Sequence, residues 1–428
     1  MVDLLSCINV DAGATALESD ERSWTYGELD EAVERRTVAL DSGGLTPGHV
    51  VPLVVRQDAE SVIDLLAHWR AGVTPAPLNS RLSLSEHKAA STALAGIEVS
   101  AQVVLWTSGT SGQPRGVAIS IEALRANARA SAERLGLSRG DTWLASLSPA
   151  HVGGFALITR SLLLGSRLLV LGSFNAERVN ERLSEITHVS LVPTQLSRIL
   201  DVRNDQPPPE TFRCALVGGA QTPKGLLDRA ISAGWPIALT YGLTELTSQV
   251  ATAPPDLSQE KPGTVGAPLS GVEVRLDQGG EIHVRGDTIA SGYVGDCSES
   301  FTDGEGWHRT GDLGSFDSDG HLWVTGRRTD RIVTGGVTVD AAEVEEVLRS
   351  HPAVADACVV GIPDEEWGER VAAWVEPDGE GATSAVLDTY LRELLSSPKI
   401  PRSYHFGTPV PRNVNGKLDR TTVRQALS

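Results

Sequence analysis

The chain has 428 residues, 40% hydrophobic and 21% charged, which is typical of a globular protein with more than one domain. Its formal net charge of -18 argues against binding to nucleic acid or to an anionic membrane surface. The four cysteines (Cys7, Cys214, Cys297 and Cys358) are far apart and show no disulfide or zinc spacing, which favours reduced thiols in a cytoplasmic protein.

Targeting and membrane signals are not found in the sequence. The N-terminus runs directly into Asp3 and Asp11, so no signal peptide is expected. The most apolar stretch, residues 155–174, is interrupted by Arg160 and Arg167, which excludes an ordinary membrane span. The oligomeric state is left open, and a homodimer is one arrangement that we consider.

The first part of the chain alternates between helical and strand patterns. Helices are predicted from residue 27 onward and over 59–71, and the β-rich runs lie at 50–55, 103–106, 168–171, 189–192 and 215–217. Such alternation predicts layered α/β subdomains around a largely parallel sheet.

The pattern changes at about residue 264. Short alternating segments at 272–276 and 281–285 are separated by Gly and Asp residues, which predicts an antiparallel, β-rich subdomain ending near 322–325. Residues 326–330 form a polar hinge candidate, and a small α+β unit follows. We therefore predict a large N-terminal domain over residues 1–326 and a small domain over residues 327–428.

A polar, glycine-rich segment follows the strand predicted at 103–106. Its glycines let backbone N–H groups approach an anion, its hydroxyls add donors, and Arg115 adds positive charge, so it suits a polyphosphate. The spacing of a Walker loop is absent, and a flexible surface turn is the alternative. The residues are Thr107, Ser108, Gly109, Thr110, Ser111, Gly112, Gln113, Pro114, Arg115 and Gly116.

This segment resembles the signature loop of the adenylate-forming superfamily, which includes acyl-CoA synthetases, adenylation domains of peptide synthetases and luciferases. The family usually has Lys where this chain has Arg115. Further motifs follow in the family's order, although each alone is also compatible with a tight turn or a helix cap. They are Gly218-Gly219-Ala220, Tyr241-Gly242-Leu243-Thr244-Glu245, Thr310-Gly311-Asp312, Arg327 in the hinge, Gly335-Gly336, and Lys417 near the C-terminus.

The resemblance implies a role for each motif in binding ATP, Mg²⁺ and CoA. Tyr241 would stack on adenine beside Gly218, Gly219, Ala220 and Gly242, and Thr244 would bind the α-phosphate. Glu245 would ligate Mg²⁺, as a hard carboxylate ligand should. Asp312 and Arg327 would bind the ribose, and Lys417 would contact the carboxylate and the α-phosphate. Gly335 and Gly336 would line a thiol channel after the small, mobile domain rotates, and Arg115 and Lys417 would join Thr244 and Glu245 in catalysis.

The acid is also suggested by resemblance. The stretches around His151, Gly219, Ser248 and Gln249 are similar to o-succinylbenzoate–CoA ligases of menaquinone synthesis, in which they would border the acyl site. Another aryl- or acyl-CoA synthetase, or a stand-alone adenylation enzyme, is the alternative for the same chemistry. A non-catalytic nucleotide-binding protein is the alternative from another class.

Overall fold

The structure is a computed structural model that describes residues 3–5, 10–41, 46–94, 96–107, 115–295, 301–413 and 416–428. Its central element is an eight-stranded sheet of order β12-β11-β10-β9-β7-β8-β1-β2. The inner pairs are parallel, and the two outermost pairs are antiparallel. The strands are β1 Thr15–Glu18, β2 Ser23–Thr25, β7 Thr142–Ala145, β8 Arg167–Val170, β9 His188–Leu191, β10 Cys214–Val217, β11 Ile237–Leu243 and β12 Ser248–Ala253.

Helices cover both faces of this sheet because alternate strand residues point to opposite sides. Trp143 and Leu168 belong to a hydrophobic cluster with α1 Tyr26–Asp41, α2 Ala59–Arg70, α4 Ile121–Leu135 and α5 Val152–Leu164. Their neighbours Leu144 and Leu169 belong to a second cluster, with α6 Ala176–Arg182, α7 Pro193–Arg203 and α8 Lys224–Ser232. Two further helices in this part of the chain are α3 Leu84–Leu94 and α9 Pro255–Glu260.

Three smaller sheets complete the large lobe. Strands β3 Val50–Val55 and β4 Thr74–Asn79 form a parallel pair, and β5 Val103–Thr107, β6 Arg115–Ile119 and β15 Gly292–Tyr293 form an antiparallel sheet. The β-rich part contains β13 Val272–Leu276, β14 Glu281–Gly286, β16 His308–Phe316 and β17 Leu322–Arg327, all antiparallel.

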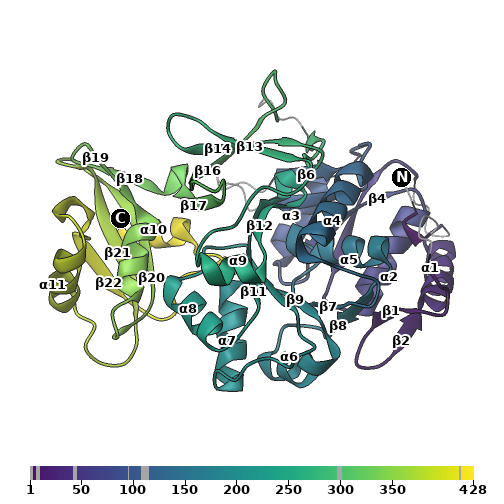
Figure 1. Ribbon diagram of the computed structural model, residues 1–428. Coiled ribbons are helices and arrows are strands. Elements are labelled where there is room, and N and C mark those ends of the chain that lie inside the picture. Colours follow the sequence, from purple (N-terminus) through teal and green to yellow (C-terminus); the bar gives the residue numbers. More distant parts are fainter. Residues whose placement is uncertain are drawn as a thin grey trace.

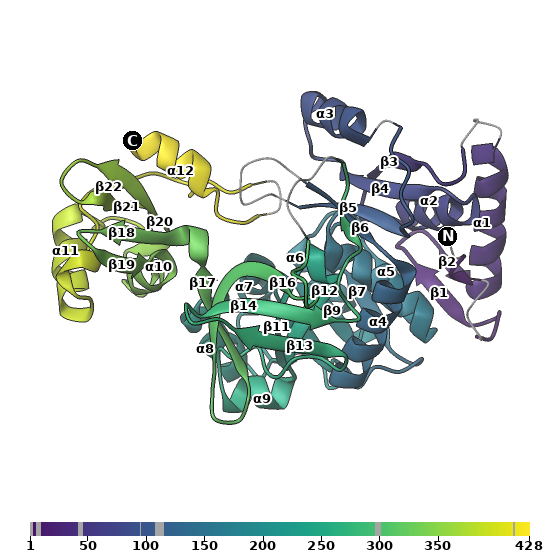
Figure 2. The same ribbon diagram turned by 90° about the horizontal axis from the view of Figure 1, so that it is seen from above.

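A small lobe stands beside the large one (Figure 1). Its sheet has the order β19-β18-β21-β20, with β22 added next to β21, and it has its own hydrophobic core. Figure 2 shows the segment before α12 running from this lobe toward the large one. The elements are β18 Arg331–Thr334, β19 Val337–Asp340, α10 Ala341–Arg349, β20 Val354–Asp364, β21 Gly368–Pro377, α11 Ser384–Leu394, β22 Ser403–Phe406 and α12 Arg420–Leu427.

The predicted fold class is confirmed: α/β layers, an antiparallel β-rich part and a small α+β lobe are all present. The strand predicted at 272–276 matches β13, and the helix predicted at 59–71 matches α2 to within one residue. The domain boundary at 326/327 falls at the end of β17 and stays a prediction. Within the described ranges, no helix is both long and apolar enough to cross a membrane.

Candidate active site

A cleft of about 1440 Å³ is lined by residues of both lobes and of the segment that joins them. Most of the residues singled out in the sequence line it: Thr107, Arg115, His151, Gly218, Gly219, Gly242, Thr244, Glu245, Ser248, Gln249, Arg327 and Lys417. Ser108, Gly109, Thr110, Ser111 and Gly112 lie outside the described residues. Tyr241, Asp312, Ala220, Gly335 and Gly336 are described but do not line the cleft.

The two ends of the predicted phosphate loop are held together by β5 and β6. Thr107 ends β5 and pairs with Arg115, which begins β6. The Arg115 guanidinium lies 5.1 Å from the centre of the Tyr293 ring, and the Tyr293 hydroxyl donates to Glu245 Oε1 at 3.3 Å. Tyr293, which the sequence analysis missed, therefore connects the cation of the loop to the proposed metal ligand. Stacking on an aromatic ring suits the planar guanidinium of Arg115 better than a lysine ammonium.

The Tyr241–Glu245 motif lies where β11 turns sharply into β12. A Cβ atom on Gly242 would lie 1.7 Å from the carbonyl oxygen of Ser248, so only glycine allows the two strands to approach this closely. The turn is completed by Thr247 and Ser248, which have φ angles of 56° and 103°. This backbone places Thr244 and Glu245 in the wall of the cleft.

Asp312 links the β-rich part to the sheet and to the hinge. Its Oδ2 accepts a hydrogen bond from the Tyr241 hydroxyl at 2.8 Å, and its Oδ1 accepts one from Arg327 Nε at 2.8 Å. Burial raises the pKa of Asp312, although the Arg327 guanidinium opposes this shift. Tyr241 is itself buried, and its burial and the nearby Asp312 raise its pKa well above the usual value. These groups lie behind the cleft wall, and Arg327 connects them to the cleft.

Lys417 enters the cleft from the small lobe. It follows a turn in which Asn413 Oδ1 accepts the Lys417 N–H at 3.1 Å and the Lys417 carbonyl accepts the Asn413 N–H at 2.8 Å. The side chain keeps contact with solvent, yet the surrounding protein and the Arg327 guanidinium lower its pKa. The carboxylates of Asp312 and Glu245 oppose this shift. The cationic groups Lys417 and Arg327 thus share one region of the cleft.

Several polar groups with little exposure to solvent also line the cleft. His151 precedes α5, and its Nε2 lies 3.3 Å from Asn79 Nδ2. Burial, followed by the charge of Lys417, lowers the pKa of His151 to about 4, so its ring is neutral at pH 7. Gln249 is 2% exposed, and its Nε2 finds no hydrogen-bond acceptor in the described part of the chain.

Arg160 on α5 also lines the cleft, and the sequence analysis missed its role. It is 2% exposed, and neither its Nε nor its Nη1 has a hydrogen-bond partner among the described residues. In the sequence it appeared only as the charge that interrupts an apolar stretch. The sequence feature that could have identified it is a single arginine within an otherwise apolar helix.

Gly335 and Gly336 form the turn between β18 and β19, with φ angles of 56° and 79°. Two successive positive φ values are typical of the tight hairpin turns that favour glycine. A Cβ atom on Gly335 would lie 2.7 Å from the Trp367 ring. In this arrangement of the lobes the turn lies outside the cleft.

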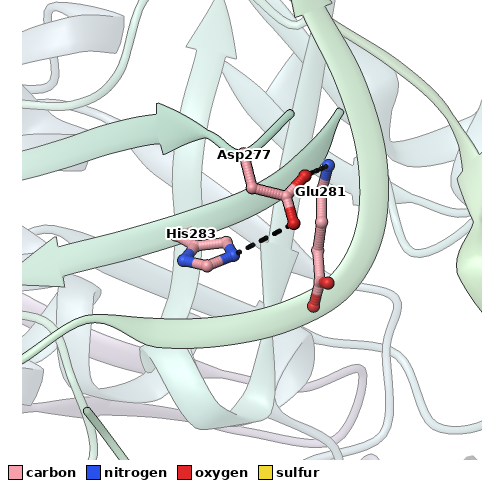
Figure 3. A group of neighbouring side chains, drawn as sticks. All are labelled: Asp277, Glu281 and His283. Carbon is pink, nitrogen blue, oxygen red and sulfur yellow. Dashed lines mark hydrogen bonds and ion pairs between the residues drawn. The ribbon is translucent and has the colours of Figure 1, made fainter. Parts of the chain in front are cut away.

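Among the described residues, two groups away from Glu245 bring together residue types that can bind metals, but their oxygens already have partners. In the first group, Asp277 Oδ1 accepts backbone N–H groups, and Asp277 Oδ2 lies 3.9 Å from His283 (Figure 3). Glu281 of the same group binds Arg309 and Arg328. In the second group, Lys261 binds both Asp317 and Asp319. Neither arrangement favours a cation over the partners already present.

The site therefore combines the Arg115 and Arg327 cations, the Glu245 carboxylate and a lysine from a second lobe, a combination that suits a nucleotide-dependent, two-lobed enzyme. The family model of AMP-binding enzymes matches residues 7–95 and 98–294, and the model of the AMP-binding enzyme C-terminal domain matches residues 343–417. The chain belongs to the AMP-binding enzyme family.

Curated relatives and solved structures agree with this assignment. The chain is 32% identical over 461 residues to the 2-succinylbenzoate–CoA ligase of Bacillus anthracis, covering 96% of this chain and 95% of that protein. A ligase of the same name from Geobacillus is 37% identical, over 76% of this chain and 68% of that protein. The o-succinylbenzoate CoA synthetase of Bacillus subtilis, in complex with its acyl-adenylate intermediate, is 29% identical with a TM-score of 0.89, over 99% and 97% of the two chains.

Proposed function

We propose that the chain is an ATP-dependent acid–CoA ligase that forms an acyl-adenylate and then a CoA thioester, with 2-succinylbenzoate as its acid. This would place it in menaquinone biosynthesis. The curated relatives are named for this activity. The observation in this chain that carries the proposal is the unpaired Arg160 guanidinium in the wall of the cleft.

A buried cation without a counter-ion is unfavourable, and such a group marks a place for an anion. Burial lowers the pKa of Arg160 to about 10, which still leaves it charged at pH 7. The nearby Cys214 does not neutralise it, because burial raises the pKa of that thiol to about 12. 2-Succinylbenzoate has two carboxylates, so one can react with ATP while the other pairs with Arg160. An acid with a purely apolar tail would leave the guanidinium unpaired.

The same cleft supports adenylation. The carboxylate oxygen of the acid attacks the α-phosphorus of ATP, and pyrophosphate leaves. Both reactants are anionic, so Arg115 and Lys417 offset their repulsion and stabilise the charge that gathers on phosphorus. Thr244 would donate to the α-phosphate, and Arg327, which Asp312 and Tyr241 support from behind the cleft wall, would lie against the nucleoside.

Glu245 fits a magnesium ion because it lines the cleft and, within the described part of the chain, its carboxylate accepts a hydrogen bond from the neutral Tyr293 hydroxyl and forms no ion pair. When bound there, Mg²⁺ would supply positive charge next to the phosphates. Burial raises the pKa of Tyr293 to about 12, so its hydroxyl keeps its proton and donates to Glu245. This contact orients the carboxylate toward the cleft.

The thiol step requires another arrangement of the lobes. The structure matches the Bacillus subtilis synthetase in complex with ATP and magnesium with a TM-score of 0.89. Its match to a double mutant of that synthetase bound to a product analogue, OSB-NCoA, has a lower TM-score of 0.72. Lys417 lies in the cleft here, whereas Gly335 and Gly336 lie outside it. These observations support a rotation of residues 327–428 that removes Lys417 and brings the glycine turn to the CoA thiol.

A cytoplasmic location, where ATP and CoA are available, is part of this proposal. The homodimer considered from the sequence stays a prediction, which light scattering checks.

The test is pyrophosphate release with ATP, Mg²⁺, CoA and a set of acids. We expect 2-succinylbenzoate to be preferred over its two monocarboxylate analogues, which lack either the ring carboxylate or the chain carboxylate. Arg160→Met should raise KM for 2-succinylbenzoate by about 30-fold or more, because a buried ion pair loses one partner. Equal use of the diacid and a monocarboxylate analogue by the unmodified enzyme would contradict the proposed acid, and no turnover on any acid would favour a binding protein.

A further inference from the structure

Arg160 has an aromatic partner in place of a carboxylate. Its guanidinium carbon lies 4.9 Å from the centre of the Trp143 ring. Trp143 is on β7, is 3% exposed and does not line the cleft, so it lies behind Arg160 as seen from the cleft. The negative face of an indole ring attracts a cation, and this attraction is largest where water is excluded.

The Trp143 ring is fixed from two directions. Its Nε1 donates to Ser190 Oγ at 3.2 Å, and its ring stacks on His188 with centroids 5.0 Å apart and planes 22° apart. His188 lies directly opposite Trp143 in the parallel pairing of β7 with β9. Burial lowers the pKa of His188 to about 4, so its ring is neutral at pH 7 and does not repel Arg160. The indole therefore has little freedom to turn away from the guanidinium.

We propose that Trp143 is a positioning residue that sets the preference for a dicarboxylate acid by holding the Arg160 guanidinium in the cleft wall. This inference rests on the proposed function, because it assigns a role to Trp143 through the carboxylate that Arg160 would bind. Trp143 does not itself touch the acid.

An aromatic partner holds the Arg160 guanidinium and leaves its charge able to attract an anion, which a carboxylate partner would prevent. Asp or Glu beside Arg160 would neutralise it and occupy its N–H groups, which would leave little to attract a second anion. The indole face attracts the charge but accepts no N–H group in its ring plane, so the guanidinium is held while Nε and Nη1 have no acceptor among the described residues. Without the ring, the guanidinium would be free to turn toward other acceptors.

Trp143→Leu and Trp143→Phe test this role, with KM and kcat measured for 2-succinylbenzoate and for the monocarboxylate analogue that the enzyme uses best. We expect Trp143→Leu to raise KM for 2-succinylbenzoate by about 10- to 30-fold, with little change in kcat or in KM for the analogue. Trp143→Phe keeps an aromatic face and should restore most of the lost preference.

The matched control is Trp235→Leu, which removes an indole of equal size that is also 3% exposed but contacts Phe212 and does not line the cleft. It should leave the ratio of the two KM values unchanged. If Trp143→Leu leaves the ratio of the KM for 2-succinylbenzoate to the KM for the analogue unchanged, Trp143 has no positioning role. If the unmodified enzyme itself shows no preference for 2-succinylbenzoate over the analogue, the proposed acid is wrong. The failure of the proposed function is therefore distinguishable from the failure of the role of Trp143.

Discussion

Lys417 is supplied by the small lobe, whereas Glu245, Arg115 and Arg160 come from the large lobe. The charges of Arg327, Asp312 and Glu245 all act on the Lys417 side chain and influence its pKa. Since the surrounding protein and Arg327 lower its pKa, Lys417 is a cation placed where added negative charge is favourable. In the proposed reaction, an ATP phosphate and the reacting carboxylate would supply that charge.

We expect Lys417→Ala to slow adenylate formation by about 100-fold or more, because one electrostatic contact to the developing charge is lost. Thioester formation from a supplied acyl-adenylate should stay within about threefold, since Lys417 would leave the cleft for that step in the proposed rotation. Single-turnover assays of the two half-reactions check this. The control is Lys399→Ala, which removes a lysine of the same lobe that binds Glu343 outside the cleft. An equal fall in both half-reactions would contradict the two-arrangement mechanism.

The turn between β11 and β12 is the element that positions Thr244 and Glu245. Position 242 requires glycine because the carbonyl oxygen of Ser248, six residues further along the chain, would clash with a Cβ atom there. Such a requirement cannot be relieved by a side-chain rotation, because both partners belong to paired strands.

Gly242→Ala should therefore destabilise the fold by about 2 kcal/mol or more and should lower adenylation more than the loss of folded protein explains. Thermal unfolding combined with pyrophosphate release per folded molecule measures both effects. Gly225→Ala is the control: this glycine is on α8 with open space around its Cβ position, so alanine should be neutral or slightly stabilising. A Gly242→Ala enzyme with normal stability and activity would show that the strands separate without cost.

The sequence predicted elements well where local pattern decides the structure. The alternation at 272–276 and the helical spacing at 59–71 are local properties, and both elements were found. The motif residues could be named by their order along the chain, and most of them line one cleft. Tyr293, Arg160 and Trp143 could not be found in this way, because their importance depends on contacts between residues far apart in sequence, such as Tyr293 with Glu245.

At the scale of the whole molecule, contacts between the lobes favour the arrangement in which Lys417 occupies the cleft. Glu346 of α10 in the small lobe accepts the backbone N–H of Lys224 at 2.9 Å, at the beginning of α8 in the large lobe. The residue before α8, Pro223, provides no side-chain cap. A carboxylate at the N-terminus of a helix is favourable because unpaired N–H groups and the helix dipole are positive there.

The proposed rotation of the small lobe would break this contact, so Glu346 would stabilise the adenylation arrangement and not the thiol-transfer arrangement. We expect Glu346→Ala to slow adenylate formation by about two- to fivefold, a modest effect because the contact is exposed to solvent. Thioester formation from a supplied acyl-adenylate should not slow. Glu343→Ala is the control, since Glu343 is on the same helix but binds Lys399 within the small lobe. Equal slowing of both half-reactions by Glu346→Ala would mean that the contact supports the fold of the enzyme and does not select between the two arrangements of its lobes.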